Sequence, residues 1–324
     1  MTVKKTSGVL RLGPFERTFA AELAARYEIP EIPDGPQRAA FLAEHAAEVR
    51  VVLTSGHPGI DAGTIAALPN LEVIVNYGAG VDSIDLDEAG RRGIGVSNTP
   101  GVLSDTVADT ALGLVLMTLR RFAAADRYVR EGRWLRDGPF PYAWDVSGLQ
   151  VGILGLGRIG SAIATRLLAF ECAIAYHNRH RIDGSPYRYA ESPRELAESV
   201  DMLVVATTGD RKTRHLVDRP VLEALGSEGY LVNIARGSVV DQDALVELLA
   251  GGGLAGAGLD VFADEPRVPA QLIELDNVVL FPHIGSATAR TRRAMAHLAI
   301  RNLDSYLATG ELVTPVLRPA QRRR

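Results

Sequence analysis

Three residues whose side chains suit acid–base chemistry and anion binding follow predicted strand ends in the second half of the chain. They are Arg236, Glu265 and His283. Histidine can give or take a proton near neutral pH, a neighbouring carboxylate favours its charged form, and the planar guanidinium of arginine matches a carboxylate. This set of side chains is typical of proton transfer to or from an anionic substrate.

Each of the three residues also has a purely structural interpretation. Arg236 could be a cation at the start of a helix, Glu265 an acidic loop residue before a proline, and His283 a hydrogen-bonded residue at a strand end. The chain contains seven histidines, so one of them could follow a strand by chance. All three residues, however, follow strands on the side of the sheet where nucleotide-binding folds bind their ligands, and this favours the functional interpretation.

A glycine-rich turn provides a second chemical signal. A predicted strand at Val151–Leu154 runs directly into a GxGxxG turn that opens a helix: Gly155-Leu156-Gly157-Arg158-Ile159-Gly160. The first glycine permits the tight turn, the second lets the backbone approach a pyrophosphate, and the third lets helix and strand pack closely. Glycine-rich turns also have structural uses, but the surrounding strand and helix predict a dinucleotide-binding site.

The next predicted strand, Ala173–His177, ends without an acidic residue. NAD-selective sites usually carry one there, where it accepts a hydrogen bond from the ribose 2′-hydroxyl. Here the turn reads Asn178-Arg179-His180-Arg181. Because guanidinium groups pair with phosphate oxygens, this turn favours NADP(H). NAD(H) remains possible, since Asn178 could bind a 2′-hydroxyl and the turn could be a solvated basic loop.

Two stretches of alternating short apolar strands and amphipathic helices must position these residues. The first runs from Gly8 to Val96, and the second contains six predicted strands between Val151 and Phe281. Such alternation is typical of parallel sheets with helical crossovers. The expected fold is α/β with two domains built on doubly wound parallel sheets, a Rossmann nucleotide domain and a flavodoxin-like substrate domain.

A chain of 324 residues is long enough for two domains, and two domains imply a cleft between them. The turn at Asn98–Gly101 marks a predicted boundary, and a helix predicted over Thr288–Leu307 has a spacing that suits packing back onto the N-terminal domain. The predicted substrate-binding (catalytic) domain is therefore discontinuous, with residues 1–99 and 289–324. The predicted dinucleotide-binding domain spans residues 100–288.

A long helix is predicted from about Ser104 to Arg130. Between Val107 and Phe122 it is apolar almost all round, so we expect it to be buried in a core or against a second subunit, and we expect a homodimer. The stretch Gly132–Asp145 is rich in aromatic residues and prolines and is expected to be ordered. It could pack on the adjacent helix or face the substrate.

Composition narrows the class of protein further. Hydrophobic residues make up 47% and charged residues 23%, as in globular proteins, and the net charge of −4 argues against a nucleic-acid partner.

The single cysteine, Cys172, lies in an apolar stretch and is predicted to be buried. Residues 1–11 lack the apolar run of a signal peptide, so we expect no membrane partner and a cytoplasmic location. No metal site is expected, because no ligand cluster has suitable spacing.

The ordered set of motifs resembles that of the D-isomer-specific 2-hydroxyacid dehydrogenases, from about residue 49 to residue 314. It adds three segments to the glycine-rich turn: Asn233–Gly237, Gly258–Pro266 and Pro282–Thr288. Within the family, the chain is most similar to glyoxylate/hydroxypyruvate reductases and hydroxyphenylpyruvate reductases. The resemblance implies that Arg236 binds the carboxylate and keto oxygen of the substrate, that His283 is the acid–base group, and that Glu265 orients His283.

The resemblance also implies further contacts. Backbone N–H groups would bind the substrate carboxylate at four positions: Tyr77, Gly78, Ala79 and Gly80. Cofactor contacts are implied, besides the glycine-rich turn and residues 178–180, at five more positions: Thr106, Thr207, Ile234, Asp260 and Gly285. Asp260 could equally cap a turn. Trp134 could reach the substrate pocket of a neighbouring subunit, as tryptophans in this loop do in some relatives.

The expected reaction is hydride transfer from NADPH to the keto carbon of glyoxylate, hydroxypyruvate or an aryl-pyruvate, giving the D-2-hydroxy acid. Domain closure would exclude water from this step. Phosphoglycerate dehydrogenase is disfavoured because the chain ends soon after Pro315 and because the turn at Asn178 is basic. Formate dehydrogenase is disfavoured because Glu265 stands where that branch carries glutamine. A nucleotide-sensing co-regulator or binding protein on the same fold is the alternative from another class.

Overall fold

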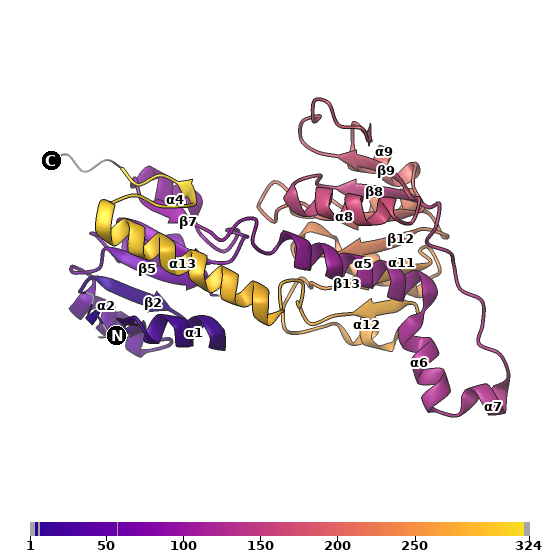
Figure 1. Ribbon diagram of the computed structural model, residues 1–324, viewed down its shortest axis with the longest axis horizontal. Helices are drawn as coiled ribbons and strands as arrows, with labels where there is room; N and C mark the ends of the chain where they lie inside the picture. The colour runs from indigo at the N-terminus through magenta and orange to yellow at the C-terminus, as the bar shows by residue number, and fades with distance from the viewer. Residues whose placement is uncertain (1–3, 6, 57, 321–324) are drawn as a thin grey trace. The chain divides into compact units, whose positions relative to one another are not determined.

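The computed structural model divides into two compact units, each described here by itself. Unit 1 comprises Met1–Leu103 and Ala287–Arg324, and unit 2 comprises Ser104–Ser286. The structure describes residues 4, 5, 7–56 and 58–320 (Figure 1). No helix among these residues is long and apolar enough to cross a membrane.

Unit 2 is built on a seven-stranded parallel sheet with the order β10-β9-β8-β11-β12-β13-β14. The strands are β8 (Gln150–Leu154), β9 (Ala173–His177), β10 (Arg188–Tyr189), β11 (Met202–Val205), β12 (Tyr230–Asn233), β13 (Gly256–Leu259) and β14 (Val278–Leu280). Counted from β8, the order is 3-2-1-4-5-6-7, which begins as in dinucleotide-binding Rossmann folds. The expected parallel α/β architecture is confirmed, with β10 as an unpredicted addition.

Helices cover both faces of this sheet. They are α5 (Ser104–Arg120), α8 (Arg158–Leu168), α9 (Pro193–Glu198), α10 (Arg219–Leu225), α11 (Gln242–Ala250) and α12 (Ala270–Glu274), with a 3-10 turn η1 (Gly237–Val239). Successive residues of a strand face opposite sides of the sheet. In β13, Leu259 belongs to the core cluster that contains Leu222 of α10 and Leu245 of α11. Gly258 lies against Leu114 of α5, so α5 covers the opposite face.

The helix expected over residues 104–130 is broken, so its prediction as one element was wrong. Arg121 adopts a left-handed conformation, with φ of 53°, and separates α5 from α6 (Phe122–Arg130). The guanidinium of Arg121 lies over the ring of Phe140, 5.5 Å from its centroid. Neither glycine nor proline marks the break, so the pattern did not reveal it. Within a single chain Phe122 is 46% exposed, so its burial depends on the expected second subunit and stays a prediction.

Residues 122–145 form a segment that we call the arm, which extends from α5 through α6 and α7 (Arg133–Asp137) (Figure 1). Two contacts of Tyr128 stabilise the arm internally. Its hydroxyl donates to the Gly138 carbonyl at 3.0 Å, and its ring meets that of Phe140 edge-on at 5.3 Å. Exposed apolar side chains nevertheless remain on the arm, among them Trp134 and Leu135. Cys172, immediately before β9, is buried, as predicted.

Unit 1 is built on a six-stranded sheet with the order β15-β7-β6-β5-β2-β4. The strands are β2 (Val9–Leu12), β4 (Glu31–Ile32), β5 (Val51–Ser55), β6 (Val73–Tyr77), β7 (Gly95–Ser97) and β15 (Pro315–Leu317), and β1 (Lys4–Lys5) pairs separately with β3 (Tyr27–Glu28). Counted from β2, the parallel strands follow the flavodoxin-like order 2-1-3-4-5, as expected. β15 pairs with β7 in the antiparallel direction.

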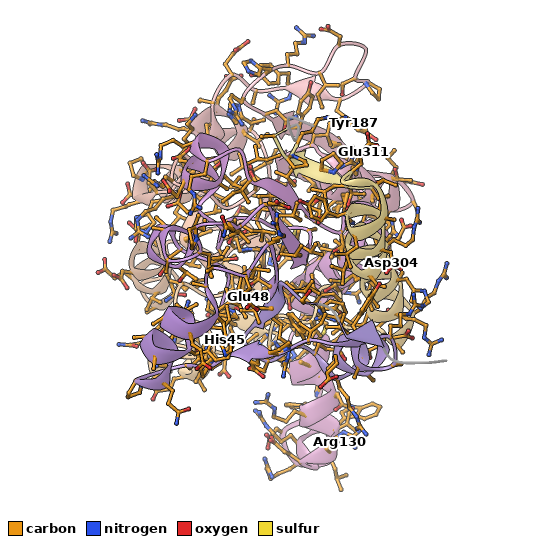
Figure 2. All side chains as sticks on the ribbon, turned by 90° about the vertical axis from the view of Figure 1, so that its left-hand side faces the viewer. His45, Glu48, Arg130, Tyr187, Asp304 and Glu311 are labelled. Atoms are coloured by element: carbon orange, nitrogen blue, oxygen red, sulfur yellow. The ribbon has the colours of Figure 1, made fainter. Side chains whose placement is uncertain are left out.

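The described residues of unit 1 also form five helices: α1 (Arg17–Ala24), α2 (Gln37–His45), α3 (Ala62–Ala66), α4 (Leu86–Arg91) and α13 (Ala289–Thr309). Thr288 caps α13 by accepting a hydrogen bond from the Thr291 N–H. The helix packs on α1 and β6. Asp304 of α13, labelled in Figure 2, accepts a hydrogen bond from the Tyr27 hydroxyl. Burial and this carboxylate raise the pKa of Tyr27 to about 12.

Candidate active site

The glycine-rich turn of unit 2 has the geometry that a pyrophosphate requires. Gly155 has φ of 102°, and a Cβ there would lie 2.6 Å from the backbone of Thr207. A Cβ at Gly160 would lie 2.2 Å from the Gly155 carbonyl oxygen, whereas a Cβ at Gly157 would meet nothing within 4 Å. No side chain caps the N-terminus of α8, which begins at Arg158. An open cradle with unused N–H groups at a helix start fits a phosphate.

Asn178 connects this turn to the end of β9. Its Oδ1 accepts a hydrogen bond from the Leu156 N–H at 2.7 Å, and the Gly155 N–H donates to the His177 carbonyl at 3.0 Å. Because a backbone N–H can only donate, the side-chain atom facing it must be the oxygen. The Nδ2 group of Asn178 is therefore left as a donor. This anchoring of the glycine-rich turn had not been predicted from the sequence.

Arg236 lies just beyond β12 in a turn that a buried asparagine holds. Asn233 accepts a hydrogen bond from the Ala235 N–H through Oδ1 and donates from Nδ2 to the Arg236 carbonyl, both at 3.0 Å. The Arg236 side chain passes Gly209, where an added Cβ would lie 2.5 Å from the arginine Cγ. Asn233 and Gly209 therefore fix where the guanidinium can lie, and the sequence had given neither residue a function.

His283 and Glu265 form a close pair. The Nδ1 atom of His283 lies 2.6 Å from Oε2 of Glu265, whose Oε1 accepts a hydrogen bond from the Phe262 N–H at 3.1 Å. Burial raises the pKa of the Glu265 carboxyl, but the hydrogen bond and charge of His283, with smaller contributions from Phe262 and Arg236, leave it below its usual value. Glu265 is therefore ionised at neutral pH. With Nδ1 held by the carboxylate, Nε2 of the exposed ring is the nitrogen available to a reacting group.

The backbone of His283 is held in a left-handed conformation, with φ of 52°. Its N–H donates to the Asp260 carbonyl at 2.9 Å, and the Asp260 carboxylate accepts from the Ile284 and Gly285 N–H groups at 2.7 and 2.8 Å. Burial raises the pKa of Asp260, and these two N–H groups partly oppose the shift. Asp260 thus serves the turn that carries His283, which agrees with the turn-capping alternative for this residue.

Unit 2 places the reacting residues after neighbouring strands. Arg236 follows β12, Glu265 lies in the loop after β13, and His283 follows β14. Four cofactor-binding candidates also lie in unit 2, at the following places: Thr106 in the first turn of α5, Thr207 after β11, Ile234 after β12, and Gly285 after His283. The carboxyl ends of the parallel strands are where ligands bind in such folds.

Tyr77, in unit 1, has a buried side chain. Its ring stacks on Phe19 with centroids 4.4 Å apart, and its hydroxyl donates to Glu16 at 3.2 Å. Burial raises the pKa of Tyr77 to about 12. Tyr77 as a whole is 4% exposed, so the loop that follows it, whose residues 78–80 are partly exposed, is what remains for a ligand.

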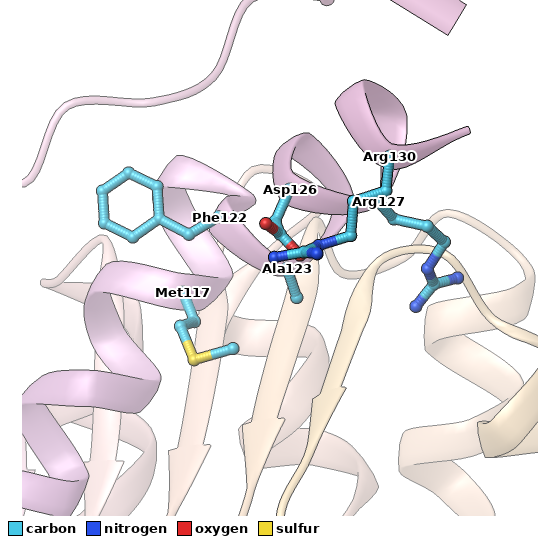
Figure 3. A pocket seen from close by; sticks show the side chains of 6 residues that line it. All are labelled: Met117, Phe122, Ala123, Asp126, Arg127 and Arg130. Carbon is cyan, nitrogen blue, oxygen red and sulfur yellow. The ribbon is translucent and has the colours of Figure 1, made fainter. Parts of the chain in front are cut away.

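Two surface hollows involve the arm or its junction with α5. An open hollow of about 700 Å³ is lined by six residues of α5 and α6, shown in Figure 3: Met117, Phe122, Ala123, Asp126, Arg127 and Arg130. A second one, of about 420 Å³, is lined by Val129, Gly132, Trp134 and Leu135. Exposed apolar hollows on a projecting segment are typical of a protein–protein interface.

Comparison with known proteins gives one family. Residues 112–285 match the model of the D-isomer specific 2-hydroxyacid dehydrogenase, NAD binding domain. The chain is 44% identical over 310 residues to glyoxylate/hydroxypyruvate reductase A HPR2 of Arabidopsis thaliana and to hydroxyphenylpyruvate reductase of Plectranthus scutellarioides, covering 96% of this chain and 99% of each relative. A crystal structure of an NADPH-dependent glyoxylate/hydroxypyruvate reductase from Sinorhizobium meliloti, in complex with NADP and malonate, is 41% identical. It superposes with a TM-score of 0.91 over 100% of both chains.

Proposed function

This chain belongs to the D-isomer-specific 2-hydroxyacid dehydrogenase family, and we propose that it reduces small 2-keto acids with NADPH. The proposed substrates are glyoxylate, hydroxypyruvate and aryl-pyruvates, and the products are the D-2-hydroxy acids. The observation that carries the proposal is the His283–Glu265 pair, at 2.6 Å, in a loop cluster that also contains Arg236. The same set of residues opposes a role as a nucleotide sensor without catalysis, and turnover of any 2-keto acid distinguishes the two.

His283 is the proposed proton donor. When bound, NADPH supplies the hydride that reaches the keto carbon. Glu265 accepts a hydrogen bond from the Nδ1–H of the charged imidazole, which directs the Nε2–H outward, and the Nε2 proton passes to the keto oxygen. After this transfer the His283 ring is neutral and keeps its hydrogen bond to Glu265. Arg236 pairs with the substrate carboxylate and polarises the keto oxygen, which keeps the reacting carbonyl in place.

The cofactor would be held by residues of unit 2. The cradle at Gly155–Gly160 and the start of α8 fit the pyrophosphate. Asn178, Arg179 and His180, in the turn after β9, are the proposed contacts to the 2′-phosphate. Asn178 is compatible with NADPH because its Nδ2 group can donate a hydrogen bond to a phosphate oxygen. Contacts from Thr106, Thr207, Ile234, Asp260 and Gly285 are part of the same proposal. Four substrate contacts, from the backbone of Tyr77, Gly78, Ala79 and Gly80, complete it.

Replacing Arg179 by alanine is expected to raise the KM for NADPH about tenfold to a hundredfold and to leave that for NADH nearly unchanged. The reason is that a hydrogen bond to a charged phosphate contributes roughly 1.5–3 kcal/mol, and only NADPH carries the 2′-phosphate. Initial rates with hydroxypyruvate and each cofactor measure the effect. Arg194→Ala is the control, because Arg194 is exposed on α9 and pairs with Glu198. Equal KM values for both cofactors in the native and Arg179→Ala proteins would contradict NADPH preference.

We also propose that the enzyme is a cytoplasmic homodimer joined through the arm. Leu135 is 96% exposed and Trp134 is 65% exposed, and both line a hollow. A second copy that covers these side chains would remove apolar area from water at roughly 25 cal/mol per Å². Leu135→Glu is therefore expected to give a monomer at micromolar concentrations at which the native chain sediments as a dimer.

The control for this experiment is Ile273→Glu. Ile273 is 64% exposed on α12, outside the arm, so the substitution adds the same charge without touching the proposed interface. Analytical ultracentrifugation of the three proteins decides the matter. A native protein that is monomeric at micromolar concentrations, or a dimer that survives Leu135→Glu, would remove the arm from the interface.

A further inference from the structure

The loop that follows β6, residues 78–81, has its carbonyl oxygens tied to one set of donors in unit 1. The Gly78 oxygen accepts from the Thr99 N–H at 2.8 Å and from Nδ2 of Asn76 at 3.2 Å. The Gly80 oxygen accepts from the same Asn76 Nδ2 at 2.8 Å. The Ala79 oxygen accepts from Nδ2 of Asn98 at 2.7 Å. Two asparagine amides therefore hold three consecutive carbonyls.

This arrangement also fixes the direction of the N–H groups. In a trans peptide the C=O and N–H bonds point in opposite directions. Holding the carbonyls of Gly78, Ala79 and Gly80 therefore turns the N–H groups of Ala79, Gly80 and Val81 away from the two asparagines. None of these three groups donates a hydrogen bond to another of the described residues. Successive N–H groups that face the same side form a binding site for an anion.

The two asparagines are themselves fixed. Asn76 is fully buried in β6, and its Oδ1 has no hydrogen-bond partner among the described residues. A buried acceptor without a partner destabilises the fold, so the position of Asn76 is not explained by stability alone. Asn98 follows β7, and its carbonyl accepts a hydrogen bond from the Thr314 hydroxyl at 2.6 Å. Thr314 is held in turn by buried Asn302 of α13.

We propose that Asn76 and Asn98 are positioning residues that preorganise the loop for the carboxylate of the 2-keto acid. Neither side chain touches the substrate. Each acts by holding a carbonyl oxygen on the inner side, so that the N–H groups of Ala79, Gly80 and Val81 are already oriented when the anion arrives. Preorganised donors bind an anion more tightly because no ordering cost remains at the moment of binding. This inference rests on the proposed function, in which this loop receives the substrate carboxylate.

The test uses Asn98, because its side chain is only half-buried and makes one of the bonds to the loop. Asn98→Ala is expected to raise the KM for hydroxypyruvate and the inhibition constant of oxalate together, each about tenfold, while kcat and the KM for NADPH change less than about twofold. Asn98→Asp should raise both constants further, because it adds a negative charge near the anion. The control is Asn70→Ala, which removes a similar amide-to-carbonyl bond, to Ala47, away from the loop.

Thr314→Val provides a milder variant in case Asn98→Ala does not fold. It removes the hydroxyl that holds the Asn98 carbonyl and keeps the volume of the side chain. We expect its KM for hydroxypyruvate to rise in the same direction by a smaller factor. An unchanged KM and oxalate constant in a folded Asn98→Ala protein would overturn the inference. A native protein that binds NADPH but reduces no keto acid would overturn the proposed function instead. In that case, calorimetry would still compare the affinity of the native and variant proteins for oxalate.

Discussion

Replacing His283 by asparagine is expected to lower kcat for hydroxypyruvate about 10²- to 10⁴-fold, the usual contribution of a positioned general acid. Asparagine tolerates the left-handed backbone that His283 adopts, with φ of 52°, so the turn should survive. What the variant lacks is a group that can release a proton to the keto oxygen. Steady-state kcat gives the loss, and titration of NADPH fluorescence should show cofactor binding that is nearly native.

A second histidine–glutamate pair supplies the matched control. His297 of α13 lies 3.5 Å from Glu22 of α1 and has no part in the proposed chemistry. His297→Asn should therefore leave kcat within about twofold of the native value, since exposed ion pairs contribute little. If His283→Asn kept more than about a tenth of the native kcat, the proton would have to come from another group, and the proposed acid would be wrong.

Replacing Arg236 by leucine is expected to lower kcat/KM for 2-keto acids about 10²- to 10⁴-fold. The loss corresponds to two charged hydrogen bonds, each worth roughly 1.5–3 kcal/mol, between the guanidinium and the substrate. Arg236→Lys should fall between leucine and the native residue, because an ammonium keeps the charge but cannot pair with two oxygens in one plane. Rates over a range of hydroxypyruvate concentrations separate the effect on KM from that on kcat.

The control for this series is Arg219→Leu. Arg219 is partly exposed at the start of α10 and pairs with Glu247, so its loss removes an arginine of unit 2 that lies outside the proposed site. Its kcat/KM should match the native value, and its affinity for NADPH should be unchanged. A drop in kcat/KM of less than about tenfold for Arg236→Leu would show that another cation binds the substrate carboxylate.

The architecture was predictable because the strands that decide it are apolar and well separated. Clear apolar patterns mark Val51–Ser55, Val73–Tyr77 and the strands of unit 2 other than β10. Six strands were not identified individually: β1, β2, β3, β4, β10 and β15. All of these except β2 have only two or three residues, too few for a pattern of alternation. The break at Arg121 was missed because neither glycine nor proline marks it, and the contact of its guanidinium with the Phe140 ring is visible only in the structure.

Some residues of the proposed site could be predicted from the sequence, and others could not. Charged residues after strands, such as Arg236 and His283, could be selected because their type and place both point to chemistry. Asn76, Asn98 and Asn233 could not, because an amide reveals its function only through the backbone groups it meets. The positions of those backbone groups depend on the conformation of the loops, which residue spacing does not predict. Asp260 had two interpretations from the sequence, and its hydrogen bonds to the His283 turn match the structural one.

The division of unit 1 into two segments has a consequence for how the protein is made. A ribosome delivers residues 1–103 first and all of unit 2 next, and only then supplies α13 and β15. Domains tend to fold as units during synthesis, so unit 2 can fold while β6 and β7 still lack the helix and the edge strand that cover them. The nascent chain therefore exposes an incomplete apolar sheet for the time needed to translate residues 104–317. Chaperones that bind such surfaces would act on unit 1 during this time.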